Sequence, residues 1–148
     1  MARSSYDATL DSLALLFIRV PLGAIFLAHG SQKLLGLFGG AGLTATQKNF
    51  EVHMGIPPIL TLLAIIAEFG GGLGVLGGLL TRLSAIGISV NMAVAIYKVH
   101  WANGFFLNWY CASGRGHGIE YNIALLGMAL ALVVTGGGRW ALDRLIWK

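Results

Sequence analysis

Four long apolar stretches alternate with polar or glycine-rich connections along this chain. They cover approximately residues 12–37, 58–80, 82–101 and 119–135. Each is close to the ~20 residues that an α-helix needs to cross about 30 Å of hydrocarbon. Because backbone N–H and C=O groups must pair with each other in lipid, such stretches are expected to be helices. The pattern predicts an all-α integral membrane protein: an antiparallel four-helix bundle in which residues 1–148 form one transmembrane domain.

The connections indicate how the bundle is arranged. A tight turn around Thr81 joins the second and third stretches into an antiparallel hairpin. The longer links, residues 38–57 and 101–118, are expected to lie on one side of the membrane and cap the bundle there. The first eleven residues are polar, and the apolar stretch after them has no clear small-x-small cleavage site. We therefore interpret that stretch as the first spanning helix and not as a signal peptide.

The distribution of positive charge predicts the orientation. The N-terminus, the tight turn and the C-terminal tail carry five positive residues: Arg3, Arg82, Arg139, Arg144 and Lys148. The two long links carry Lys48 and Arg115. Because cytoplasmic loops are enriched in Lys and Arg, both termini are expected in the cytoplasm. The sequence thus predicts a multi-pass protein of the plasma (inner) membrane.

Composition supports a membrane protein and argues against other classes. Hydrophobic residues make up 56% of the chain and charged residues only 11%, whereas soluble domains carry about 25% charged residues. The net charge of +4 comes from Lys and Arg residues that punctuate the apolar stretches without forming a patch, so we expect no nucleic-acid partner. The single cysteine, Cys111, excludes an internal disulfide, a two-cysteine redox pair and a Cys-rich metal site.

Two charged residues fall deep inside the predicted spans. A rise of about 1.5 Å per residue places Arg19 and Glu68 at similar depths in the first and second helices. Since an unpaired charge in the bilayer centre is costly, we predict that they form an intramembrane pair. Two interpretations stay open: a salt bridge that only fixes helix register, and a carboxylate that titrates or orients a ligand.

A second polar group is predicted near the outer helix ends, as a candidate pocket for a quinone or another small ligand: His29, Lys33, Asn91, Lys98, His100, Trp101, Glu120 and Tyr121. Lysines that snorkel to the interface and an ordinary interfacial aromatic belt are the alternatives. The histidines and the carboxylate lack ligand spacings such as HxxxH or ExxH, so no metal site is predicted.

Glycines recur at every fourth position in the second apolar stretch. Gly70, Gly74 and Gly78 form a GxxxGxxxG run, a spacing that lets another helix approach closely. The run predicts tight packing, and it leaves open whether the partner helix belongs to the same chain or to a second copy in a homo-oligomer.

Several motifs together resemble one family. They are RVPLGAIFLAHGSQKL from Arg19, FGGAGL from Phe38, AEFGGG from Ala67, GLLTRLSA from Gly78, NGFF from Asn103, GIEYN from Gly118 and GGGRWALDR from Gly136. In order and spacing, over nearly the whole chain, they resemble the DoxX family of small four-helix membrane proteins of bacteria and archaea.

The resemblance implies a membrane oxidoreductase system. The family name derives from a subunit of an archaeal thiosulfate:quinone oxidoreductase, and other members are linked to redox complexes and oxidative-stress responses. Relatives that handle disulfides need paired cysteines, which this chain lacks. With no haem pair, flavin motif or iron–sulfur cysteines, electrons would need a partner subunit's cofactor or a quinone. Two hypotheses follow: a subunit or accessory protein of a quinone-linked system, or a non-catalytic assembly module, small-solute binder or conduit. Whether the chain is catalytic stays open.

Overall fold

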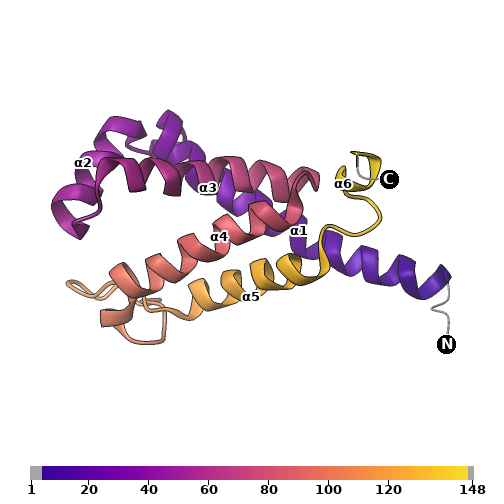
Figure 1. The fold of residues 1–148 in the computed structure, drawn as a ribbon. Coiled ribbons are helices and arrows are strands. Elements are labelled where there is room, and N and C mark those ends of the chain that lie inside the picture. Colours follow the sequence, from indigo (N-terminus) through magenta and orange to yellow (C-terminus); the bar gives the residue numbers. More distant parts are fainter. Residues whose placement is uncertain (1–4, 147–148) are drawn as a thin grey trace.

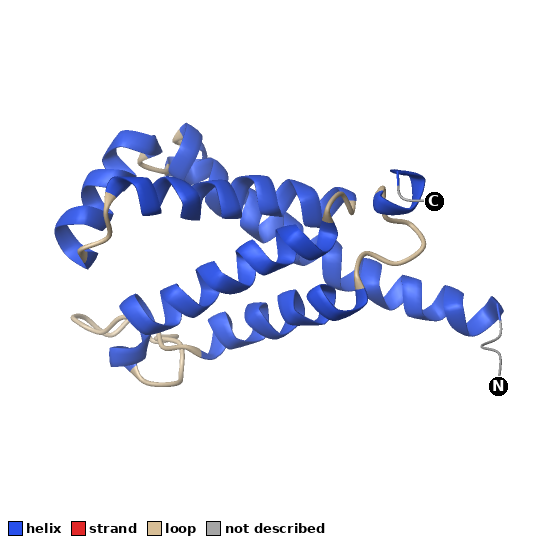
Figure 2. Cartoon of the chain, viewed as in Figure 1, coloured by secondary structure: helices blue, strands red, loops and turns tan. Residues whose placement is uncertain are grey.

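Every regular element in this computed structural model, which describes residues 5–146, is a helix (Figures 1 and 2). The α-helices are α1 (Ser5–Leu35), α2 (Gly42–Met54), α3 (Pro58–Gly77), α4 (Thr81–Ala95), α5 (Glu120–Thr135) and α6 (Asp143–Ile146). The predicted all-α class is confirmed. Two charges in the orientation argument, Arg3 and Lys148, lie outside the described residues.

Three helical segments are long and apolar enough to cross a membrane: Tyr6–Leu35, Pro58–Gly77 and Thr81–Asn103. The apolar helix α5 has 16 residues and is shorter than these spans. A fourth crossing by α5 and the cytoplasmic placement of both termini therefore stay predictions.

Element boundaries differ from the sequence pattern in three places. The first helix begins at Ser5, seven residues before the predicted start, and ends at Leu35. The link 38–57 contains the helix α2, which the pattern did not predict. The third stretch is α-helical only to Ala95 and then continues as a π-helical segment, Ile96–His100, and a 3-10 turn, Trp101–Asn103. The π-helical segment contains Lys98 and His100.

The helices form two pairs, α1 with α3 and α4 with α5, and the pairs are joined by the short turn after α3 and by direct packing of α3 against α4. In Figure 1 the pairs lie close near that turn and separate toward the end that carries α2 and the loop after α4. The buried core, which includes Leu22, Phe26, Val75, Ile88 and Leu132, lies where the pairs meet. Large apolar side chains also cover the outside of the spanning helices, as lipid contact requires.

Glycines set the close approach of α1 and α3. A Cβ atom on Gly72 would lie 2.5 Å from the Leu27 amide nitrogen, and one on Gly30 would lie 2.5 Å from that of Phe69. One on Gly23 would lie 2.7 Å from the Leu76 amide nitrogen. These contacts fix the antiparallel register of the two helices.

The predicted GxxxGxxxG run is only partly used for packing in the described chain. Gly74 packs against the α3–α4 turn and α4: its Cβ would lie 2.8 Å from the Leu79 carbonyl oxygen and 3.1 Å from Ser84 Cβ. Gly78 lies beyond α3 and caps it with a left-handed φ of 72°. A Cβ on Gly70 would meet nothing closer than Ile66, at 4.0 Å. The three glycines are therefore not one packing surface, because the α1–α3 contact uses a different face of α3.

Candidate functional site

Arg19 and Glu68 do not form the predicted pair. Arg19 is 1% exposed, and its guanidinium donates to three backbone carbonyls: Nε to Val75 (2.9 Å), Nη2 to Leu76 (3.0 Å) and Nη1 to Gly137 (2.9 Å). Val75 and Leu76 belong to the last turn of α3, whose carbonyls lack intrahelical partners and whose dipole favours a cation. Arg19 thus ties the end of α3 to the segment after α5.

The glycine-set register explains why the prediction was wrong. Gly23 of α1 lies against Leu76 of α3, and Gly30 lies against Phe69. This alignment places Arg19 at the C-terminal end of α3, beyond Val75, which is itself nearly two helical turns from Glu68. It places the end of α1 beside Glu68. The sequence-based estimate counted the depth of each residue from the predicted end of its own helix, so it contained no information on the offset between α1 and α3.

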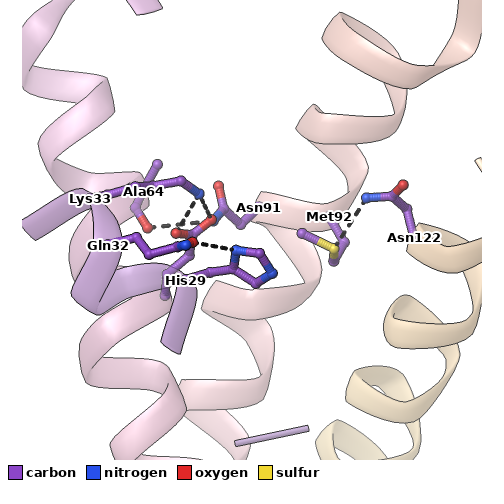
Figure 3. A network of polar contacts seen from close by, with 8 residues as sticks. His29, Gln32, Lys33, Ala64, Asn91, Met92 and Asn122 are labelled. Carbon is purple, nitrogen blue, oxygen red and sulfur yellow. Dashed lines mark hydrogen bonds and ion pairs between the residues drawn. The ribbon is translucent and has the colours of Figure 1, made fainter. Parts of the chain in front are cut away.

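Glu68 instead forms an ion pair with Lys33. Lys33 Nζ donates to both carboxylate oxygens, at 2.5 Å for Oε2, and Asn91 Nδ2 donates to Oε1 at 2.9 Å. The side chain of Glu68 is 7% exposed and that of Lys33 is 28% exposed. Three helices, α1, α3 and α4, thereby meet at one buried carboxylate. Figure 3 labels its partners, Lys33 and Asn91.

Consecutive residues of α4 connect this ion pair to α5. In Figure 3, Asn91 points toward Lys33 and Gln32, whereas Met92 points toward Asn122 on α5. The Asn122 Nδ2 atom lies 3.6 Å from the Met92 sulfur, a weak contact for a buried amide. His29, on the same side as Lys33, contacts Gln32 Oε1 at 3.1 Å.

These polar groups line a cavity of about 590 Å³ between the two helix pairs, which we call the polar cavity. Its inner wall includes the buried Phe26, Glu68, Met92, Asn122 and Leu125. Exposed residues such as His29, Lys98 and Trp109 form its rim. The cavity is thus accessible from outside, and its inner wall is mainly apolar, with the Lys33–Glu68 ion pair on one side and Asn122 on the other.

Six of the eight residues predicted as a pocket line the polar cavity: His29, Lys33, Asn91, Lys98, His100 and Tyr121. Trp101 and Glu120 do not. Trp101 is 67% exposed on the 3-10 turn. Glu120 accepts a hydrogen bond from the Leu107 amide at 3.1 Å and so holds the loop after α4.

Residues from both long links also line the cavity, and the pocket prediction did not include them. Phe50 and Met54 come from α2, and Trp109 and His117 come from the loop before α5. The His100 ring contacts the His117 carbonyl oxygen at 2.8 Å and so anchors that loop to the end of α4.

A sequence signal for α2 existed. Leu43, Thr46, Phe50 and Met54 are spaced three, four and four residues apart, a helical repeat that places them on one face. The polar residues between them masked this pattern.

No cluster of three or more His, Cys, Asp or Glu suitable for a metal ion occurs among the described residues.

Comparisons with known proteins agree with this architecture. The DoxX family model matches residues 14–101. The chain is 30% identical to the inner membrane protein YqjF of Escherichia coli, with 94% of this chain and 96% of that protein aligned. It is 31% identical to an uncharacterized membrane protein of Mycobacterium tuberculosis, with 88% and 80% aligned. It is 28% identical to the putative oxidoreductase CatD of Bacillus subtilis, with 90% and 87% aligned. No solved structure matches the chain significantly.

Proposed function

The chain belongs to the DoxX family of multi-pass membrane proteins, and on that premise we propose that it binds a quinone-like molecule in the polar cavity as a subunit or accessory protein of a membrane redox system. The observation that carries the proposal is the composition of this cavity. Hydrogen-bond donors lie on both sides of an apolar space between helices: Lys33 on α1, and Asn122 with Tyr121 on α5.

The size and lining of the cavity suit such a ligand. Small-molecule sites usually enclose about 300–1,000 Å³, with an apolar lining and a few convergent polar groups. The polar cavity encloses about 590 Å³. A quinone head group is a flat, mainly apolar ring with two opposed carbonyl acceptors. The walls formed by Phe26, Met92 and Leu125 would contact the ring.

Lys33 has a donor left for one ligand carbonyl. An ammonium group has three N–H donors, and the two carboxylate oxygens of Glu68 accept two of them. Glu68 and Asn91 would therefore hold Lys33 charged and oriented. On the opposite side, the Asn122 amide has only the weak Met92 sulfur contact among the described residues and could donate to the second carbonyl.

The redox part of the proposal draws on a relative, CatD, which carries the name putative oxidoreductase. Reducing a quinone to a quinol consumes two electrons and two protons. In this proposal a partner subunit with its own cofactor supplies the two electrons and water supplies the two protons, and the role of this chain is to bind and orient the ring.

Binding can be measured with a short-chain ubiquinone, decylubiquinone, by quenching of tryptophan fluorescence in detergent or nanodiscs. Trp109 lines the polar cavity and Trp101 does not, so saturable quenching is expected to persist in Trp101→Phe and to fall strongly in Trp109→Phe. Quinones extracted from the purified protein and identified by mass spectrometry give a second, label-free measurement.

Lys33→Met should raise the dissociation constant of decylubiquinone at least about tenfold, because the free energy of one hydrogen bond from a charged group corresponds to such a factor. Because this variant leaves Glu68 buried without its partner, Lys33→Met/Glu68→Gln is measured beside it. The control is Lys48→Met, on the exposed surface of α2, which should bind like the wild type. Wild-type affinity in both Lys33 variants, or quenching that does not saturate, would refute the proposal.

A further inference from the structure

We propose that a second cavity, at the opposite end of the bundle, binds the phosphate-bearing head group of an anionic phospholipid. This basic cavity measures about 640 Å³. Its walls come from the first half of α1, the α3–α4 turn with the start of α4, and the segment from the end of α5 into α6. In Figure 1 these parts lie together at the end away from α2. The inference is independent of the ligand proposed for the polar cavity.

Hydrogen bonds hold the walls of the basic cavity in place. The Asp143 carboxylate accepts the Leu80 amide at 2.6 Å and the Thr81 amide at 2.9 Å, at the start of α4. The Asp143 amide in turn donates to the Gly78 carbonyl at 2.8 Å. Arg19 binds the Gly137 carbonyl from the other side. The segment after α5 is therefore fixed against the α3–α4 turn before any ligand binds.

The cavity carries an excess of positive charge that these contacts leave available. Arg82, Arg139 and Arg144 line it, with Asp11 and Asp143 as the acidic residues. Asp143 already accepts two amides and faces the buried charge of Arg19. Arg139 contacts Thr9 Oγ1 at 3.0 Å, whereas the exposed guanidinium groups of Arg82 and Arg144 form no ion pair within residues 5–146. Guanidinium groups bind phosphate oxygens in a bidentate manner.

The surroundings favour a lipid over a free anion. Leu83, which lines the basic cavity, is 64% exposed, and Trp140 and Leu145, which follow Arg139 and Arg144 in the sequence, are 51% and 71% exposed. Tryptophan at such a position is typical of the membrane interface, and the leucines offer a surface for acyl chains. At about 1.5 Å per residue, α5 is roughly 24 Å long, so its 16 residues fall short of the hydrocarbon thickness. Head groups are drawn inward at the end of a short helix. Basic pockets between membrane helices bind anionic head groups in this way.

The test measures thermal unfolding of the full chain in detergent after adding phosphatidylglycerol or, as the uncharged comparison, phosphatidylcholine. Phosphatidylglycerol should raise the midpoint by roughly 5 °C more than phosphatidylcholine at saturating lipid. Arg82→Gln/Arg144→Gln should remove this difference, and native mass spectrometry should show at least tenfold less bound phosphatidylglycerol. The control, Arg115→Gln, changes an exposed arginine in the loop at the other end of the bundle and should keep the full shift.

Three results would overturn the proposal: equal shifts with the two lipids, an unchanged shift in the double arginine variant, or an equal loss in Arg115→Gln. Inorganic phosphate distinguishes the two sources of a phosphate group. If phosphate alone at millimolar concentration reproduces the whole shift, the site binds a free anion and the lipid assignment is wrong. Both arginines are exposed, so the double variant is expected to fold.

Discussion

Replacing Arg19 should strongly destabilise the bundle. Arg19→Met keeps much of the side-chain volume and removes the three hydrogen bonds to the carbonyls of Val75, Leu76 and Gly137. Interhelical polar contacts in membrane proteins average about 0.6 kcal/mol and reach about 1.7 kcal/mol each. Removing three such bonds from a side chain that is 1% exposed should lower the free energy of unfolding by roughly 2–5 kcal/mol.

Arg19→Lys separates the effect of charge from that of geometry. A lysine keeps the positive charge near the end of α3, but its one nitrogen cannot reach carbonyls on both α3 and the segment after α5 as the planar guanidinium does. We expect Arg19→Lys to lose at least half as much stability as Arg19→Met. The assay is reversible unfolding in mixed SDS–detergent micelles, followed by tryptophan fluorescence.

A double-mutant cycle tests whether Arg19 acts apart from Glu68. Because the two side chains bind different partners, the destabilisation of Arg19→Met and of Glu68→Gln should add to within about 0.5 kcal/mol. A larger coupling energy would mean that the two charges interact directly, as the sequence pattern first suggested. Arg19→Lys with wild-type stability would also refute the reasoning, because the three-carbonyl geometry would then have no energetic value.

Two further predictions follow from close packing and from titration. Gly72→Ala should lower the free energy of unfolding by about 1–3 kcal/mol through overpacking, because the new Cβ would lie 2.5 Å from the Leu27 amide nitrogen. Gly70→Ala, on the same helix, is the control. Its Cβ would meet nothing closer than 4.0 Å, so it should be neutral or stabilising in the same unfolding assay. Although burial acts to raise the pKa of Asp143, hydrogen bonds from Thr81 and Leu80 and the charge of Arg19 lower it overall. Its stabilising contribution is therefore complete above the unfolded pKa of about 3.9 and is lost as the pH falls through the lower folded pKa. Unfolding midpoints measured between pH 7 and 3 should fall less steeply for Asp143→Asn than for the wild type, and parallel curves would contradict this.

Hydropathy by itself determined the class of this protein. The apolar stretches are long and continuous, and in lipid an α-helix satisfies the backbone N–H and C=O groups within each stretch. The helices α1, α3, α4 and α5 could therefore be placed from their composition. The short turn around Thr81 determined that α3 and α4 lie side by side. Composition also predicted an outer polar group, because polar residues in apolar helices must face each other or a cavity, and six of its eight residues line the polar cavity.

Tertiary structure alone decided which charges meet. The pairing of Glu68 with Lys33, and of Arg19 with carbonyls, depends on a register that Gly23, Gly30 and Gly72 set by allowing close backbone contact. A shift of two turns between helices leaves their hydropathy unchanged, so the one-dimensional pattern carries no record of it. The hydropathy pattern likewise does not show the basic cavity, because its walls come from segments far apart in the sequence: α1, the α3–α4 turn with the start of α4, and the segment after α5. Apolar content determined that the chain enters a membrane, and the packing distances between helices determined where its charges lie.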